Sequence, residues 1–243
     1  MRNTLQLSRK RNTYSVDLVA LVSVILLLVI GTYSRNGLWK DEIDLWTDCV
    51  GKSPRKARPY VNLGVAYINA GVYDKAMEAS QRAIEIDPKA AYGYYNLSIV
   101  FQKRGELDKA IEMVKRSLEV DPTVYMAFYS FGGIYFEKGQ YRESVEAFRK
   151  FLEIYPYFPE VHNMLAIIHV AQKQFDKAVV EFEGEIRINP YNTLAHVNLG
   201  QIYWHEFRNR QKAVYHFKIA LMLDPFLPRR GEIRNLVRQL EGS

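Results

Sequence analysis

NLGVAYINAGVYDKAMEASQRAIEIDP, residues 62–88, is the stretch whose pattern returns along most of this chain. A proline ends each copy, and the spacings between successive prolines are 34, 34, 34, 34 and 35 residues. These prolines are Pro54, Pro88, Pro122, Pro156, Pro190 and Pro225. A fixed period of this length predicts stacked copies of one small unit, because each copy has a hydrophobic face that it cannot bury alone.

Each period is expected to contain two amphipathic helices. Large side chains recur at i, i+3 and i+7 in the first half of the first unit, at Tyr60, Leu63 and Tyr67, which is helical spacing. A glycine interrupts units one to three, and a second amphipathic stretch then runs to the proline, which cannot continue a helix. One register of every first helix holds a small residue, which lets two crossing helices approach closely. These small residues are Gly64, Ser98, Gly132, Ala166 and Gly200.

The repeated pattern resembles the tetratricopeptide repeat (TPR) family, in which L-G-x-x-Y, a later Ala and a closing Pro recur in a 34-residue frame. The resemblance implies an all-α TPR solenoid of five helix-turn-helix repeats. We expect these repeats at residues 57–90, 91–124, 125–158, 159–192 and 193–227.

Departures from the pattern predict irregular packing in the fourth and fifth units. Lys173 stands where units one to three have Gly, and Glu185 stands where the first and last units have Ala. The fifth unit has one extra residue near Arg208 to Arg210, so we expect its turn to bulge.

Both ends of the repeat array are expected to differ from a full repeat. Residues 35–56 match the second half of a unit, and we predict a half-repeat helix there. Residues 228–243 are predicted to form a capping helix, because a solenoid needs a polar-faced helix to cover its last apolar surface. The apolar stripe of this helix is Ile233, Leu236, Val237 and Leu240.

Residues 14–34 are predicted to form a transmembrane helix. Residues 18–34 contain no charged side chain, and about 20 apolar residues suffice to span a bilayer. A cleaved signal peptide is the alternative, but the flank IGTYSRN lacks a small-residue cleavage site, so we favour an uncleaved signal anchor. The basic residues in segment 1–13 predict a cytoplasmic N-terminus, with the repeats on the periplasmic, luminal or extracellular side of a single-pass membrane protein.

The charge distribution argues against a nucleic-acid partner. The formal net charge is +6, and Arg2, Arg9, Lys10 and Arg11 supply +4 of it. No run of Lys and Arg with interleaved aromatic residues stands out in the repeats.

No catalytic signature is present: we find no phosphate-binding Gly-rich loop, no G-x-S-x-G and no H-E-x-x-H. Asp41, Glu42 and Asp44 lie together, but helical spacing favours a solvated helix face over a metal or acid–base site. We therefore expect no enzyme activity and no cofactor.

The histidines and the cysteine favour packing over chemistry. His162 and His196 stand one period apart, but the same register holds Tyr or Phe in the earlier units, which favours aromatic packing over a metal site. Cys49 is the only cysteine, so an intrachain disulfide is excluded, and its register favours a small packing residue.

The family resemblance implies that the first helices line a concave groove. One register of these helices is rich in Asn, and an amide can bind a peptide backbone irrespective of its sequence, although local hydrogen bonding by Asn is an equal alternative. Flanking positions are aromatic or apolar, as recognition surfaces often are. The residues predicted to contact an extended protein segment are Arg58, Asn62, Tyr92, Tyr95, Asn96, Met126, Tyr129, Ser130, Asn163, Val197 and Asn198.

The leading functional hypothesis is a membrane-anchored TPR scaffold that binds other proteins and performs no catalysis. An alternative comes from residues 32–42 and 52–64, whose junction of span and repeats resembles that of transmembrane TPR-containing O-mannosyltransferase-like proteins. That resemblance implies an accessory or truncated part of a membrane glycosyltransferase system. A third hypothesis, a periplasmic assembly factor for pili or secretion, has no particular residue in its favour.

Overall fold

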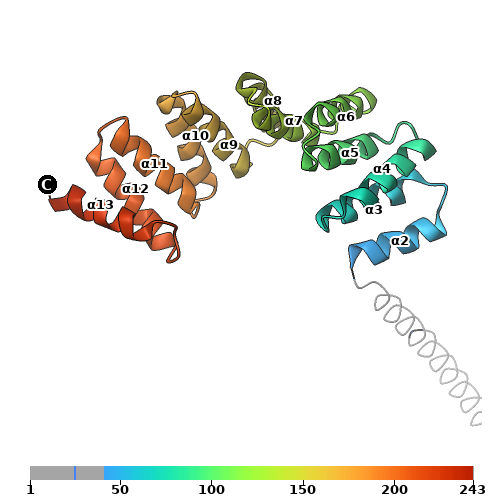
Figure 1. The fold of residues 1–243 in the computed structure, drawn as a ribbon, viewed down its shortest axis with the longest axis horizontal. Helices are drawn as coiled ribbons and strands as arrows, with labels where there is room; N and C mark the ends of the chain where they lie inside the picture. The colour runs from blue at the N-terminus through green and yellow to red at the C-terminus, as the bar shows by residue number, and fades with distance from the viewer. Residues whose placement is uncertain (1–24, 26–40, 243) are drawn as a thin grey trace, which may run out of the picture. The chain divides into compact units, whose positions relative to one another are not determined.

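The computed structural model describes Ile25 and residues 41–242, and the part from residue 41 to residue 242 consists of helices and turns without a strand (Figure 1). Twelve helices occur between residues 42 and 242. In chain order they are α2 Glu42–Lys52, α3 Ala57–Asn69, α4 Tyr73–Ile86, α5 Ala91–Lys103, α6 Leu107–Val120, α7 Met126–Glu137, α8 Tyr141–Ile154, α9 Pro159–Ala171, α10 Phe175–Ile188, α11 Thr193–His205, α12 Arg210–Leu223 and α13 Arg230–Gly242. The predicted all-α fold class is confirmed.

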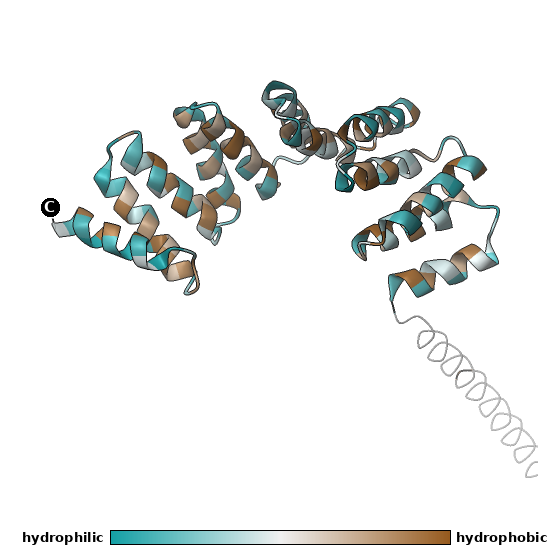
Figure 2. Cartoon of the chain, in the orientation of Figure 1, coloured by the Kyte–Doolittle hydropathy of each residue, from teal (hydrophilic) through white to brown (hydrophobic). Residues whose placement is uncertain are grey.

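The chain divides into two units, residues 1–96 and 97–243, and the division falls inside α5. In the first unit, α3 and α4 form a helical hairpin and α2 packs on α3. In the second unit, α7 with α8, α9 with α10, and α11 with α12 form hairpins, and α13 packs on α12. Each helix carries polar and apolar residues, as Figure 2 shows along the ribbon.

The predicted membrane segment, residues 14–34, lies outside the described residues except for Ile25. Within the described part of the chain, no helix combines the length and the apolar character that crossing a bilayer requires. The membrane span therefore stays a prediction from the sequence.

A residue in the left-handed conformation ends the first helix of each repeat. Gly71 has a φ of 73°, and Gly105 and Gly139 have nearly the same value. In the first four repeats the next residue donates its backbone N–H to a carbonyl five positions earlier, as Val72 does to Tyr67 at 2.9 Å. This 6→1 bond satisfies a carbonyl at the helix end.

Two non-glycine residues take the same conformation in the last two repeats. Lys173 replaces the glycine of the fourth repeat with a φ of 58°, at a cost of about 1–2 kcal/mol. In the fifth repeat Arg208 has a φ of 53°, and the turn from residue 206 to residue 209 is one residue longer than the other turns within repeats. The predicted irregular turn is therefore present, and Asn209 ends it by capping α12 through Lys212 N at 3.0 Å.

Small residues allow the two helices of a hairpin to cross closely. A Cβ placed on Gly132 would lie 2.4 Å from the Phe148 ring, and one on Gly200 would lie 2.6 Å from the Phe217 ring. Each ring therefore occupies the space that a side chain would fill. Ser144 adds a hydrogen bond across the same crossing, from its Oγ to the Gly132 carbonyl at 2.7 Å.

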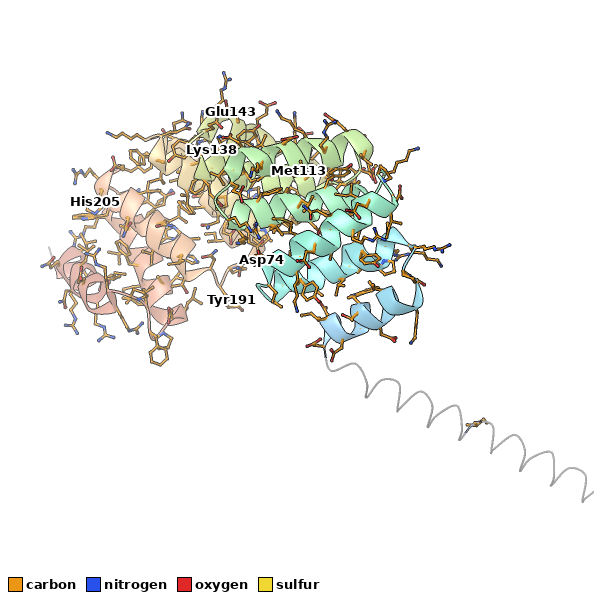
Figure 3. The ribbon with its side chains drawn as sticks, turned by 45° about the vertical axis from the view of Figure 1, so that its right-hand side comes forward. Asp74, Met113, Lys138, Glu143, Tyr191 and His205 are labelled. Carbon is orange, nitrogen blue, oxygen red and sulfur yellow. The ribbon has the colours of Figure 1, made fainter. Side chains whose placement is uncertain are left out.

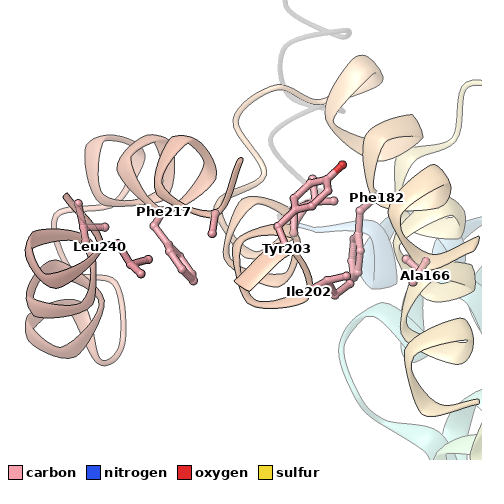
Figure 4. Packing of buried hydrophobic residues seen from close by; sticks show 11 residues of the cluster. Ala166, Phe182, Ile202, Tyr203, Phe217 and Leu240 are labelled. Atoms are coloured by element: carbon pink, nitrogen blue, oxygen red, sulfur yellow. The ribbon is translucent and has the colours of Figure 1, made fainter. Parts of the chain in front are cut away.

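The last helices share one hydrophobic cluster (Figure 4). Phe182 and Leu199 are fully buried in it, and Phe217 is 1% exposed. The whole predicted stripe of α13 belongs to this cluster or packs against it: Val237 and Leu240 are buried, and Ile233 and Leu236 are partly buried. The final helix thus covers apolar surface of α12 in the way expected of a cap.

We expect the free energy of unfolding to depend on the absence of a side chain at Gly132. Gly133, on the same helix, supplies a matched control. Gly132→Ala forces Cβ into the buried Phe148 ring, so the free energy of unfolding should fall by about 1–3 kcal/mol. Gly133→Ala meets only the end of the Gln102 side chain at 3.4 Å and should stabilise the helix by up to about 1 kcal/mol. Urea unfolding followed by circular dichroism measures both; equal effects of the two variants would contradict the close crossing.

Candidate functional site

A pocket of about 330 Å³ lies between α11 and α13. Its apolar lining combines a groove residue predicted from the sequence, Val197, with Phe217 of α12 and with Ile233 and Leu236 of α13. Volume and lining suit one apolar side chain of a bound segment, because binding pockets in proteins are mostly apolar with a few polar groups at fixed positions.

Polar side chains form the rim of this pocket. Gln201 and His205 line it from α11, Glu232 lines it from α13, and Arg229 lines it from the turn just before α13. Arg229 pairs with Glu232, its Nε donating to Oε2 at 2.9 Å, and His205 lies at the surface (Figure 3). From residue 205 to residue 243 there are eight Lys and Arg against four Asp and Glu, so this end of the chain carries a positive surplus.

In the first unit, the predicted groove residues differ in accessibility. Arg58 is exposed, Tyr92 is 50% exposed, and Asn62 and Tyr95 are partly buried. Asn96 is 1% exposed, and its Nδ2 donates to the backbone carbonyl of Val61 at 2.9 Å. At this position the structure therefore favours local hydrogen bonding over contact with a peptide backbone. The Asn96 amide links α5 to α3 and does not face solvent.

In the second unit, Met126 and Tyr129 pack against a core cluster that includes Phe148 and Phe151. The Tyr129 ring centroid lies 5.6 Å from that of Phe151, and burial raises the pKa of its hydroxyl. Ser130 is buried as well. These three side chains therefore contribute to the core to different degrees. Asn163, Val197 and Asn198 are partly buried, and the Asn163 amide oxygen lies inside without a hydrogen-bond partner among the described residues.

His162 pairs with a residue of its own hairpin. Its Nδ1 lies 2.9 Å from Glu181 Oε2, and its Nε2 lies 3.3 Å from the Pro156 carbonyl. Arg149 donates to the other Glu181 oxygen at 2.8 Å, so the carboxylate, with a side chain 7% exposed, is flanked by two nitrogen groups. His162 and His196, which stand one period apart in the sequence, thus have separate partners.

His196 pairs with His216, the two Nδ1 atoms lying 3.0 Å apart. The other nitrogen of His196, Nε2, lies 3.3 Å from the Pro190 carbonyl. Because a carbonyl only accepts, the neutral His196 ring carries its proton on Nε2, and His216 must then donate from Nδ1. Both rings are buried, at 4% and 6% exposure.

Burial lowers the pKa of His216 to about 4, and the positive charges of His196 and Lys212 act in the same direction. Burial also lowers the pKa of His196, against the hydrogen bond to Pro190. Tyr203 covers this pair: its ring stacks on His216, and its hydroxyl donates to Glu183 at 3.1 Å. The rings therefore form a neutral buried pair at pH 7.

Comparison of two registers would have revealed these pairs. The aromatic register of the first helices reads Tyr60, Tyr94, Phe128, His162 and His196. The register that faces it on the second helices reads Ala79, Met113, Ala147, Glu181 and His216. Both registers become polar in the fourth and fifth repeats. The first register alone predicts aromatic packing and does not show that its two histidines face polar residues.

Glu185 is a second buried carboxylate of the fourth repeat, in the register of Ala83 and Ala220. Its side chain is 1% exposed, and burial raises its pKa. Asn192 Nδ2 donates to Oε1 at 2.6 Å, while Oε2 has no partner among the described residues. The predicted irregular packing of this repeat is thus a buried acid held by the residue that also caps α11.

The remaining polar candidates have structural explanations. Asp41 caps α2 by accepting from Asp44 N at 2.9 Å, and Glu42 and Asp44 lie in the first turn, where negative charge favours the helix. Cys49 is free and partly exposed. Within the described part of the chain, no three His, Cys, Asp or Glu side chains gather as a metal site.

Comparison with known families identifies the repeats. One tetratricopeptide repeat model matches residues 57–90 and 127–158, and a second matches residues 79–112. The repeats in these parts of the chain are therefore tetratricopeptide repeats. The comparison with curated protein sequences gave no match.

Solved structures show the same fold. YrrB, described as a TPR protein with an unusual peptide-binding site, is similar with a TM-score of 0.61 and 19% identity, over 82% of this chain and 98% of YrrB. MamA is similar with a TM-score of 0.61 and 22% identity, over 72% and 94% of the two chains. PilF of Pseudomonas aeruginosa is similar with a TM-score of 0.65 and 21% identity, over 78% and 90%. The chain thus has the all-α fold of a TPR solenoid.

The buried histidine pair predicts a loss of stability in acid. An unfolded histidine has a pKa near 6.5 and that of folded His216 is about 4, so the unfolded state binds the proton first as the pH falls. We expect the free energy of unfolding to fall by about 2–3 kcal/mol between pH 7 and pH 4.5 from this group. The double variant His196→Tyr with His216→Ala recreates the Tyr60–Ala79 pair and should remove that part of the decrease in urea titrations. An identical pH profile of variant and parent would contradict the assignment.

Proposed function

We propose that this protein is a non-catalytic scaffold that binds an extended segment of a partner protein and holds one apolar side chain in the pocket between α11 and α13. The single observation that carries the proposal is this pocket, which opens at the surface on the first helix of the fifth repeat and on the final helix. Its floor of Val197, Phe217, Ile233 and Leu236 offers only apolar contact, and its rim offers donors and acceptors for a backbone.

The fold supports a protein or peptide partner. TPR arrays present a row of similar helices, and a row of repeated surfaces suits an extended segment. YrrB, which is similar in fold, is described as having a peptide-binding site. That similarity makes a peptide segment the first ligand class to test on this chain.

Further contacts are proposed on each unit separately. In the first unit, the accessible Arg58, Asn62, Tyr92 and Tyr95 would contact the partner. In the second unit, Met126, Asn163 and Asn198 would do so, together with Val197 in the pocket. Asn96, Tyr129 and Ser130 would act indirectly, since they hold neighbouring helices in place.

We also propose that residues 14–34 anchor the chain in a membrane, with residues 1–13 on the cytoplasmic side. The support is the sequence: an uncharged apolar stretch follows a basic start. The alternative role as an accessory part of a glycosyltransferase system rests on the junction residues alone and gains no support from the repeats.

Blocking the pocket tests the scaffold proposal. Peptides selected from a phage-displayed random 12-residue library against the full chain should share an apolar residue. Gln201→Trp places a large ring at the exposed rim and should weaken their binding at least tenfold in fluorescence anisotropy. Gln211→Trp, on the exposed start of α12, is the matched control and should leave binding unchanged. Selected peptides that bind parent and Gln201→Trp equally would exclude the pocket as their site.

Membrane anchoring has its own test. The full chain should sediment with membranes after alkaline carbonate extraction, and a chain that starts at residue 35 should remain in the supernatant. In sealed vesicles with the native orientation, protease added from the cytoplasmic side should leave the repeats intact. Digestion of the repeats under these conditions would reverse the proposed orientation, and carbonate-extractable full chain would contradict the span.

A further inference from the structure

One stripe of the second helices is charged in the first three repeats. Residues at i, i+4 and i+7 of this stripe read acidic, basic and acidic in α4, α6 and α8. They form ion pairs: Arg82 with Glu85 at 2.8 Å, Arg116 with Glu119 at 3.0 Å, and Lys150 with Glu146 at 3.3 Å. These residues are solvated, as their side-chain exposures of 52–67% show.

The same stripe is apolar on α12, where it reads Tyr215, Ile219 and Met222. Tyr215 is 61% exposed and Met222 is 74% exposed, and Ile219 between them is partly exposed. Phe226, in the turn that follows α12, is 92% exposed as well. On the neighbouring α10, Val180 occupies the register of Tyr215 and is 65% exposed.

This stripe is separate from the core side of α12. The core side of the helix carries Ala213, Phe217 and Ala220, all buried. The helix is therefore apolar on two faces, and described residues cover only the face toward the core. An exposed apolar surface of this kind, at a place where sister repeats have ion pairs, indicates an interaction site.

We propose that the face of α12 formed by Tyr215, Ile219 and Met222 is a second docking surface, and that it takes an amphipathic helix of a partner protein whose apolar seam is flanked by acidic residues. The spacing i, i+4, i+7 forms the kind of ridge that packs against another helix. This surface is distinct from the pocket between α11 and α13, so the inference does not depend on the proposed peptide site.

Charge complementarity specifies the acidic flanks. The helix α12 contains Arg210, Lys212 and Lys218 and no acidic residue. Two of the four acidic residues from residue 205 onward are already paired: Glu232 with Arg229, and Glu241 with Lys218. Arg210, Arg234 and Arg238 make no ion pair within the described part of the chain. A partner with acidic residues beside its apolar seam would therefore meet a positive surplus, which favours association.

A pair of model helices tests this surface. One 18-residue labelled peptide carries Leu at i, i+4, i+7 and i+11 with Glu on both flanks, and its control carries the same Leu seam with Lys flanks. In fluorescence anisotropy with the full chain at 50 mM salt, the Glu peptide should bind at least tenfold more tightly than the Lys peptide, and salt at 500 mM should weaken it.

The variant Tyr215→Glu, Ile219→Arg, Met222→Glu gives α12 the acidic, basic and acidic stripe of α6. The first three repeats already carry such a stripe, so we expect the fold to accommodate it. The triple variant should weaken binding of the Glu peptide at least tenfold while circular dichroism and the melting temperature stay close to those of the parent. Gln201→Trp should leave this binding unchanged, which separates the result from any failure of the pocket.

Other outcomes would overturn the inference. Equal binding of the Glu and Lys peptides would contradict the proposed acidic flanks of the partner. Unchanged binding of the Glu peptide to the triple variant would contradict this face of α12 as the docking surface. If the parent chain binds phosphatidylserine vesicles but not the Glu peptide, and the triple variant loses the vesicle binding, the face is a membrane contact instead. Self-association lost in the triple variant, again without peptide binding, would make it an interface between two copies of this chain.

Discussion

The structure depends on the close crossing of two helices, which the hairpins achieve with a small residue on the first helix. In the third and fifth repeats that residue is glycine, and an aromatic ring of the second helix takes the space of the missing side chain, as Phe148 does above Gly132 and Phe217 above Gly200. The contact fixes the distance between the helices, and neighbouring registers must then fit the remaining space. Interior packing is dense enough that a single added methyl group is felt.

The constraint explains how polar residues enter the interior of the fourth and fifth repeats. A tyrosine or phenylalanine ring in the first helix faces a small or flexible residue in repeats one to three. When a histidine replaces that ring, its second nitrogen needs a partner, because a buried polar group without a hydrogen bond is costly. Glu181 and His216 supply the partner in the two cases. The aromatic shape is kept, and a hydrogen bond replaces part of the apolar contact.

The periodicity of the sequence predicted most of the fold, because the prolines and glycines that recur at a fixed spacing also set the helix boundaries. Proline and glycine end helices through the backbone alone, so their positions predicted the turns without knowledge of the rest of the molecule. The site was harder to predict. Asn96 has the register of a groove residue, but whether its amide turns to solvent or to the Val61 carbonyl depends on the neighbouring helix. The pocket between α11 and α13 depends on the angle at which the last helix packs, which no single register encodes.

The repeats also differ in where they place their charges. Repeats one to three place ion pairs on the outer stripe and keep the facing registers aromatic and apolar, whereas the fifth repeat has a polar pair inside and an apolar stripe outside. A buried His–His pair contributes less to stability in acid than a tyrosine over an alanine would. The exposed side chains Tyr215 and Met222 bury little apolar surface within the chain and so add little to its stability. Stability alone would favour the arrangement of the first repeats throughout. Of these two departures, only the exposed stripe is accessible to a partner, and it lies in the repeat that also borders the pocket.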